Sequence, residues 1–276
     1  MRLGLRLLLL GLASLALWAG PGQAAPKIAS LNLCADQYLV ALADPDQITS
    51  LSPDAHDPVL SYAADQARAY PTTKGSAEAI AALGPDLVFV NRYGRDGTKS
   101  LLRELGIEVI ELETAQDFNA IKKQTRLIAR AIGHPERGEM LIAAMEAELA
   151  ALAPPADRTR LVAVNLQRRG FVAGKGTLID EVMARAGLDN LARQLSGDAV
   201  RQVPLESIIV HQPDILILND PDFAEEDWGT ILLRHPALER LFPPERRIVL
   251  ESRYTVCGSP AYPAAVGVIR NRLNAP

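Results

Sequence analysis

The 276-residue chain is poor in the residues that build metal centres, because it has only four histidines and two cysteines. A site for a bare transition-metal ion usually needs three or four His, Cys or carboxylate ligands that converge. Only His56 stands in a loop after a predicted strand and beside an acidic residue, Asp57. The sequence therefore predicts no site for a bare metal ion and no resident cofactor.

The chain also lacks a basic excess and the motifs of common enzymes. Its 29 Lys and Arg residues stand against 33 Asp and Glu residues, which gives a formal net charge of −4. A nucleic-acid-binding surface requires the opposite balance. No nucleophile elbow, phosphate-binding loop or zinc-protease helix motif is found, and the Gly-Lys-Gly-Thr sequence at 174–177 is interpreted as a strand-to-helix turn. We therefore expect neither an enzyme nor a partner of nucleic acid.

Long apolar runs are confined to the N-terminus. Arg2 and Arg6 precede an apolar stretch over residues 7–19, and small residues follow up to Ala25. This order of charge, apolar core and small exit is typical of a secretory signal peptide. The apolar core is too short to cross a hydrocarbon layer of about 30 Å comfortably. We predict that residues 1–24 are a cleaved signal peptide and that the mature chain is exported without stable membrane insertion.

The remaining chain alternates short β-rich apolar runs with helical patterns. Such runs occur at residues 28–31, 48–51, 87–90, 108–112, 161–164, 215–218 and 248–250. Alternation of this kind is typical of a parallel sheet covered by helices. Because the runs form two series, the sequence predicts an α/β fold with two Rossmann-like lobes, over residues 25–133 and 156–276.

A single long helix is predicted between the two series. Gly133 suits a helix exit and Pro135 suits a first helical turn. Apolar residues then recur at three- and four-residue spacing until Pro154 and Pro155. We expect a helix over about residues 135–152, within a connecting segment 134–155, that holds the lobes at a nearly fixed distance.

One segment is repeated within the chain. Residues 76–91 read SAEAIAALGPDLVFVN and residues 204–219 read PLESIIVHQPDILILN, so Glu78 aligns with Glu206 at a constant offset. A helix, a Pro-Asp turn and a buried strand recur in many α/β proteins, and this explains most of the repeat. It does not require a glutamate at the same helix position twice.

In their order and spacing, these segments resemble the periplasmic binding proteins of the ferric-siderophore and cobalamin family. The resemblance rests on KIASL at 27–31, GSAEAIAALGPDLV at 75–88, LGIEV at 105–109, FVAGKGTLIDEVMARAGLDNLA at 171–192, the second glutamate segment, and Ser-Pro at 259–260. It implies two lobes with a ligand cleft between them, a periplasmic location and a monomer that delivers its ligand to an ABC permease with its ATPase. It also implies that Glu78 and Glu206 dock against permease arginines.

Ligands of open α/β sheets sit beyond the carboxyl ends of the strands. The first lobe places there Asn32, Cys34, His56, Asp57, Arg92, Tyr93 and Arg95. The second lobe places there Arg168, Arg169, Phe171, Asp220, Phe223, Trp228, Arg253, Tyr254 and Cys257. Arginine suits anionic oxygens and aromatic faces suit a ring-shaped ligand, although a loop arginine can equally face water.

The cleft residues predict reversible capture of a metal chelate. The arginines favour a ferric siderophore, and a corrinoid such as cobalamin is the close alternative if the aromatic residues dominate. A different class of function, an exported sensor that reports ligand occupancy to a membrane signalling partner, is also compatible with the sequence. Many relatives carry Ser-Pro-Ser after the first strand, whereas this chain carries Asn-Leu-Cys-Ala-Asp at 32–36.

Cys34 and Cys257 are predicted to come from cleft loops of opposite lobes. They could form a disulfide, bind a metal in the ligand, or remain separate thiols. A bridge needs Cα atoms within about 7 Å and would oppose lobe opening, whereas oxidising surroundings favour it. We rank two free thiols that face the ligand above a disulfide.

Overall fold

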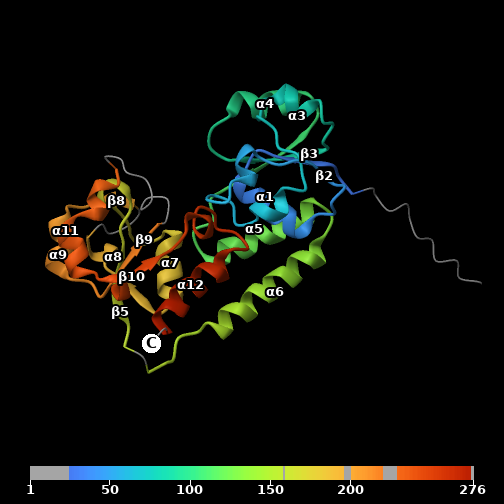
Figure 1. Cartoon of the computed structure of the whole chain (residues 1–276). Helices are drawn as coiled ribbons and strands as arrows, with labels where there is room; N and C mark the ends of the chain where they lie inside the picture. The colour runs from blue at the N-terminus through green and yellow to red at the C-terminus, as the bar shows by residue number, and fades with distance from the viewer. Residues whose placement is uncertain (1–24, 158, 196–199, 220–228, 275–276) are drawn as a thin grey trace, which may run out of the picture.

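The computed structural model describes residues 25–157, 159–195, 200–219 and 229–274. The predicted signal peptide, residues 1–24, lies outside the described residues. The chain forms two α/β lobes, each built on its own parallel sheet, as predicted (Figure 1). Among the described residues, no helix combines the length and the apolar character that crossing a membrane requires.

The first lobe contains a four-stranded parallel sheet in the order β2-β1-β3-β4. Its strands are β1 (Ile28–Ser30), β2 (Ile48–Ser50), β3 (Leu87–Asn91) and β4 (Glu108–Leu112). Its helices are α1 (Leu33–Leu42), α2 (Ala64–Ala67), α3 (Ala77–Ala81), α4 (Asp96–Glu104) and α5 (Phe118–Ala131). Successive side chains of a strand point to opposite faces. Leu87 and Phe89 therefore pack with α1 and α5, whereas Val88 and Val90 pack with α3 and α4.

The second lobe contains a four-stranded parallel sheet in the order β10-β9-β5-β7. Its strands are β5 (Leu161–Asn165), β7 (Leu188–Asn190), β9 (Ile215–Leu218) and β10 (Arg247–Val249). A separate antiparallel pair joins β6 (Phe171–Ala173) and β8 (Val200–Gln202). The helices are α7 (Leu178–Arg185), α8 (Ala192–Leu195), α9 (Leu205–His211), α11 (Pro236–Leu241) and α12 (Tyr262–Asn274). All four residues of β9 are buried, which is typical of a parallel strand covered on both faces.

Short 3-10 turns complete the chain at η1 (Pro53–His56), η2 (Arg168–Gly170), η3 (Ile231–Arg234), η4 (Pro244–Arg246) and η5 (Ser252–Tyr254).

The connecting helix α6 spans Pro135–Ala151, close to the predicted range. Proline supplies the fixed φ of a first helical turn, and Gly133, at φ 84°, ends α5 just before it. The helices α5 and α6 pack closely at Gly138, where an added Cβ would lie 2.6 Å from the Cβ of Ala129. The exact lobe boundaries, at residues 133 and 156, stay a prediction.

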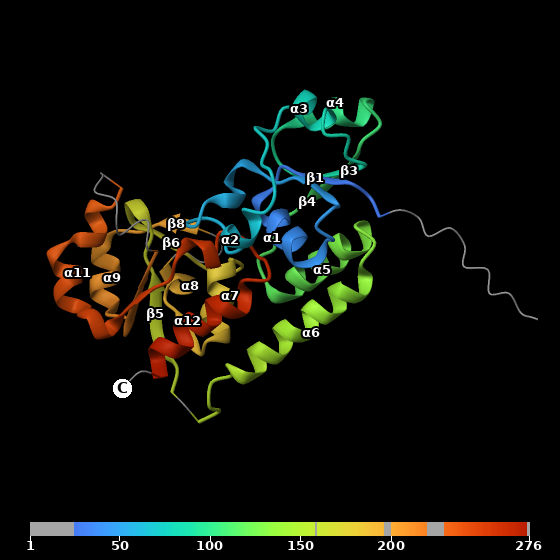
Figure 2. The same cartoon turned by 45° about the vertical axis from the view of Figure 1, so that its right-hand side comes forward.

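One hydrophobic core extends across both lobes. Phe118 and Ile121 of α5 belong to the same buried cluster as side chains of α6, α7, α12 and the second sheet. The rings of Phe118 and Tyr262 stack with centroids 5.3 Å apart, and the backbone N–H of Leu178 donates to Gln116 Oε1 at 2.9 Å. Helix α12 lies beside α6 and α7 in both views (Figures 1 and 2). The lobes are therefore joined by packing as well as by α6.

The repeated segment has a similar structure in both lobes, a short helix followed by a left-handed residue, a Pro-Asp pair and a buried strand. Gly84 and Gln212 occupy equivalent positions after α3 and α9, and both have left-handed φ values, 60° and 43°. The Asp86 carboxylate accepts the Lys27 N–H at 2.7 Å, and Asp214 accepts the Val162 N–H at 2.8 Å. Each Asp therefore fixes the start of the neighbouring central strand.

We expect both lobes to unfold in one transition because they share the core around Phe118. Phe118→Ala should lower the free energy of unfolding by about 3–5 kcal/mol. Leu127→Ala, on the more exposed part of the same helix, is the matched control and should cost less than about 1 kcal/mol. Urea unfolding followed by circular dichroism measures both. Two separate transitions, only one of them shifted by Phe118→Ala, would contradict a shared core.

Candidate functional site

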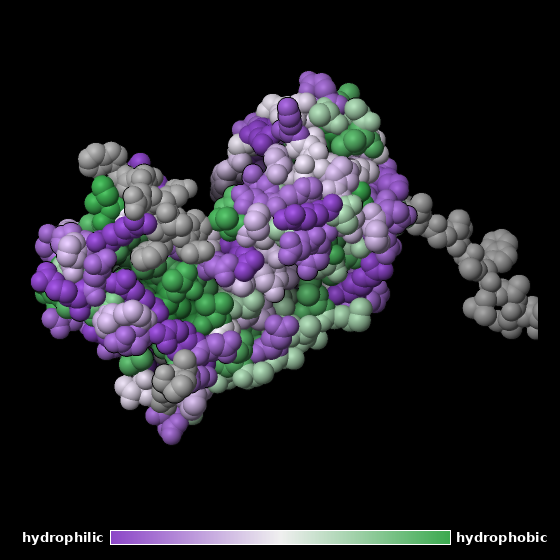
Figure 3. All heavy atoms as spheres, viewed as in Figure 1, coloured by the Kyte–Doolittle hydropathy of each residue, from purple (hydrophilic) through white to green (hydrophobic). Residues whose placement is uncertain are grey.

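The surface is hollowed between the two lobes (Figure 3). Loops that follow the carboxyl ends of strands from both sheets meet where the lobes join. Cys34, after β1, and Ala115, after β4, contact Cys257 and Gly258 in the loop after β10. Loops of the two lobes therefore meet here, and that they face a ligand stays a prediction.

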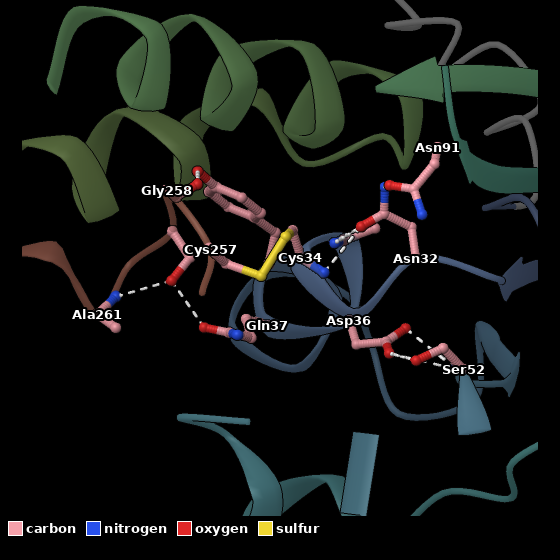
Figure 4. The surroundings of a disulfide bond; sticks show 12 residues. Asn32, Cys34, Asp36, Gln37, Ser52, Asn91, Cys257, Gly258 and Ala261 are labelled. Atoms are coloured by element: carbon pink, nitrogen blue, oxygen red, sulfur yellow. Dashed lines mark hydrogen bonds between the residues drawn. A yellow bond between two sulfur atoms is a disulfide. The ribbon is translucent and has the colours of Figure 1, made fainter. Parts of the chain in front are cut away.

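The side chains of Asn32 and Asn91 form a hydrogen bond in the first lobe, beside the junction of the two lobes (Figure 4). Asn32 is only 3% exposed, and its Oδ1 accepts the N–H groups of Cys34 and Ala35 at 2.8 and 3.1 Å. This N-cap satisfies two backbone donors at the start of α1. The Asn32 Nδ2 donates to Asn91 Oδ1 at 2.7 Å. The structure therefore gives Asn32 a positioning role, and its predicted contact with a ligand stays a prediction.

The second lobe carries an equivalent pair of amides. Asn165, at the end of β5, donates to the Oδ1 of Asn219, after β9, at 3.4 Å. In each lobe the pair bridges the carboxyl ends of two neighbouring central strands. The repeat thus extends to the polar groups at the strand ends.

Asp36 is a buried carboxyl group that is not among the predicted site residues. It is 1% exposed, and it accepts the Ser52 hydroxyl at 2.5 Å and the Ser52 backbone N–H at 3.2 Å (Figure 4). Burial raises the pKa of Asp36 from 3.8 to about 6, although the hydrogen bonds from Ser52 oppose this shift. The group ties the first turn of α1 to the end of β2, beside the candidate site.

His56 is held by the first lobe itself. Its Nε2 lies 2.9 Å from the carbonyl oxygen of Ala67 and 3.0 Å from that of Tyr70. A ring nitrogen that donates to backbone carbonyls fastens the loop after β2. Among the described residues, no group of three or more His, Cys, Asp and Glu side chains is arranged to hold a metal ion.

Two of the predicted site arginines are paired with glutamates. Arg92 forms an ion pair with Glu113, and Arg253 forms one with Glu251 at 2.7 Å. The Arg253 guanidinium also lies 5.2 Å from the ring centroid of Tyr254. These pairs lower the net positive charge that the arginines were expected to supply.

The other predicted basic residues are divided between the lobes. Arg95 has a left-handed backbone and donates to the Gly75 carbonyl at 3.1 Å. Arg168 is half-buried in η2, and the Arg169 N–H donates to the carbonyl of Gly229 at 2.8 Å. Arg95 thus belongs to the first lobe, and Arg168 and Arg169 belong to the second.

An aromatic pair spans the two lobes. The rings of Tyr62, in the loop after β2, and Tyr254, in η5, have centroids 5.7 Å apart and are tilted by 51°. Tyr254 is one of the predicted site residues, whereas Tyr62 is not, because it lies farther beyond the end of its strand. Tyr93 is 81% exposed, and Phe171 is partly exposed at the start of β6. Trp228 lies outside the described residues, as do Asp220 and Phe223.

A cavity of about 620 Å³ lies beside β4 and α5. The Arg92–Glu113 ion pair lines this cavity together with Thr114, Lys123 and Gln124. It therefore shares one predicted residue with the candidate site but extends along the edge of the first lobe.

The ranking of two free thiols is wrong, because Cys34 and Cys257 form a disulfide (Figure 4). Their Cα atoms are 5.3 Å apart, well within the distance that a bridge needs. The loop after β10 packs against α1 where the lobes join, so the bridge does not span an open cleft. The two sulfur atoms are consequently bonded to each other rather than offered to a ligand as thiolates.

Asp36 gives a prediction for the pH dependence of stability. A carboxyl whose pKa is raised by folding stabilises the fold below its unfolded pKa, and this stabilisation is lost as the pH rises from about 4 through about 6. The loss from this group should be about 3 kcal/mol. Asp36→Asn keeps the shape but not the charge, so the variant should lack this component. Urea unfolding of both proteins between pH 4 and 8 measures it; parallel stability profiles would refute the assignment.

Known proteins that are similar to this chain include binding proteins for small molecules. A cobalamin-binding protein of Halobacterium salinarum is 27% identical over 196 residues, which cover 69% of this chain and 53% of that protein. The chain spans about half the length of the curated relatives it matches.

Solved structures match over most of the chain. The periplasmic heme-binding protein RhuT from Roseiflexus sp. RS-1 is 26% identical, with a TM-score of 0.71 over 90% of this chain and 99% of that one. An ABC-type Fe³⁺-hydroxamate transport protein from Saccharomonospora viridis has 21% identity and a TM-score of 0.67 over 91% and 94%, which shows the fold. The model of the family described as periplasmic binding protein matches residues 28–241. The protein therefore belongs to the family of periplasmic binding proteins, as the sequence resemblance indicated.

Proposed function

We propose that this protein captures a planar metal tetrapyrrole, a cobalamin-type corrinoid or a heme, and delivers it to an ABC permease with its ATPase. Family membership implies a periplasmic or extracellular location. We place the protein in the periplasm as a monomer that binds reversibly and performs no chemistry. The observation that carries the choice of ligand is the Tyr62–Tyr254 pair, which offers aromatic surface from both lobes.

The arginines support a siderophore less than the sequence alone indicated. A ferric catecholate or carboxylate siderophore carries net negative charge and is best held by positive charge that is not already neutralised. Arg92 and Arg253 instead pair with glutamates of the same lobe. Aromatic side chains combine a large apolar surface with a polar edge, which suits a flat macrocycle. The relatives named for cobalamin and heme support the same ligand class.

Ligand titration tests the proposed class. Mature protein, residues 25–276, should give a saturable absorbance change with hemin or with cyanocobalamin, at one ligand per chain. Tyr254→Ala removes the ring and should weaken binding at least tenfold. Tyr254→Phe keeps the ring and is the matched control, with affinity near that of the unaltered protein. Tight binding of a ferric trihydroxamate, with no response to either tetrapyrrole, would overturn the proposed class.

Glu78 and Glu206 support the proposed delivery to a permease. Both are exposed on the first turns of the short helices α3 and α9, at the same position in the repeat. The two copies of the repeat place Glu78 and Glu206 at the second residue of each helix, so the molecule offers two carboxylates at matching positions. We propose that each carboxylate meets a basic site on the permease.

Charge reversal separates docking from simple solvation. Glu78→Lys and Glu206→Lys should each slow association with the permease, and the double variant should be worse, because like charges then meet at the interface. Folding and ligand affinity should be unchanged, since exposed charges alter stability by less than about 0.5 kcal/mol. Glu148→Lys on the exposed face of α6 is the control. Unaltered uptake by the double variant at limiting protein concentration would exclude the docking role.

A further inference from the structure

Residues 252–261 form a strap between the lobes. The segment leaves the second sheet after β10, contacts the first lobe, and returns to the second lobe at α12. Its middle is buried, with Cys257 and Ser259 almost without exposure. A surface loop of the second lobe would not need such burial.

The strap is held along one face of α1. Cys257 is bonded to Cys34, the Ser259 hydroxyl donates to Gln37 Oε1 at 2.7 Å, and the Gly258 carbonyl accepts the Tyr38 hydroxyl at 3.0 Å. Gln37 and Tyr38 lie three and four residues after Cys34, so all three residues are on one side of the helix. All three contacts therefore hold the same short part of the strap, residues 257–259.

Gly258 allows the close approach that these bonds require. A Cβ at this position would lie 2.2 Å from the carbonyl oxygen of Ala115, at the end of the first lobe's sheet. No side chain larger than hydrogen fits there without movement of the backbone. The strap is therefore packed against two elements of the first lobe, α1 and the loop after β4.

The strap also carries candidate ligand-binding residues. Arg253 and Tyr254 precede Cys257 by only a few residues, and the Tyr254 ring meets Tyr62 of the first lobe. Arg253 is oriented by Glu251 and by the Tyr254 ring. The positions of Arg253 and Tyr254 thus depend on how the strap is attached to the first lobe.

We propose that the Cys34–Cys257 disulfide is a second, covalent joint between the lobes, and that it positions Tyr254 for ligand binding. The first joint is α6. The lobes are then connected at two places, by the Cys34–Cys257 disulfide and by helix α6. Two connections leave the lobes less freedom to rotate or slide against each other than one connection does. Only the ligand-binding part of this inference rests on the proposed function.

Hydrogen exchange measured by mass spectrometry tests the joint without a ligand. In a Cys34→Ser, Cys257→Ser protein, peptides that cover residues 252–261 and the start of α1 should exchange at least tenfold faster. Peptides from β9, within the second lobe, should be unchanged. Reduction of the folded, unaltered protein is a second route to the same state if the double variant does not fold. Unchanged exchange in the strap after the bond is removed would overturn the joint.

Two controls separate the joint from a general loss of stability. Ile121→Val lowers the stability of the shared core but leaves the disulfide, so it should not raise exchange selectively in the strap. Tyr38→Phe removes one hydrogen bond to the strap and should raise exchange there by less than loss of the disulfide does. Equal selective loosening in Ile121→Val would show that the strap only reports global stability, and would overturn the inference.

Titration with hemin and cyanocobalamin tests the positioning role. The disulfide-free protein should bind the tetrapyrrole that the unaltered protein binds at least tenfold more weakly, and Ile121→Val should bind normally. A loosened strap with unaltered affinity would overturn the positioning role. If the unaltered protein binds neither tetrapyrrole, the proposed function fails, while faster exchange in the strap would still support the joint.

Discussion

The relation between the two lobes depends on one hydrophobic core that takes side chains from both of them. The start of α5 belongs to the first lobe in sequence, yet Phe118 stacks on Tyr262 of α12 and packs among residues of the second sheet. Burial of apolar surface is the main favourable contribution to folding, so this packing fixes the relation of the lobes more firmly than a helical linker by itself. Helix α6, the strap and the opposed loops all take their positions from it. The hollow between the lobes is thus framed by a rigid base.

The site residues are organised by strand ends on this base. In each lobe a pair of asparagines bridges two neighbouring strands, Asn32 with Asn91 and Asn165 with Asn219. Asn32 and Asn165 are buried and use much of their hydrogen-bonding capacity inside the protein, whereas Asn91 is exposed. The two buried amides therefore support the loops that follow these strands. The predicted site residues include exposed aromatic side chains, and two of the arginines, Arg92 and Arg253, are paired with glutamates. This combination is the basis on which a tetrapyrrole ligand is proposed.

Local signals in the sequence predicted most of the architecture. Proline at the first turn of α6, the three- and four-residue spacing of its apolar face, and the repeat with its two Pro-Asp turns all depend on neighbouring residues. Contacts between distant segments were harder to predict. Cys34 and Cys257 are 223 residues apart, and their pairing depends on a strap whose path only the fold reveals. Tyr62 lies too far beyond β2 for a rule based on strand ends, and Asp36 is buried by tertiary packing. The Arg92–Glu113 pair could have been anticipated, because both residues follow neighbouring strands.

The central claim is that the protein carries a metal tetrapyrrole outside the cytoplasm. Its most direct test is the absorption spectrum and mass of the small molecule that co-purifies with the protein from its native cells, without added ligand. The account predicts the bands of a corrinoid or a heme, the corresponding mass, and no more than one molecule per chain. A ferric hydroxamate or catecholate spectrum, with the mass of a siderophore, would contradict it.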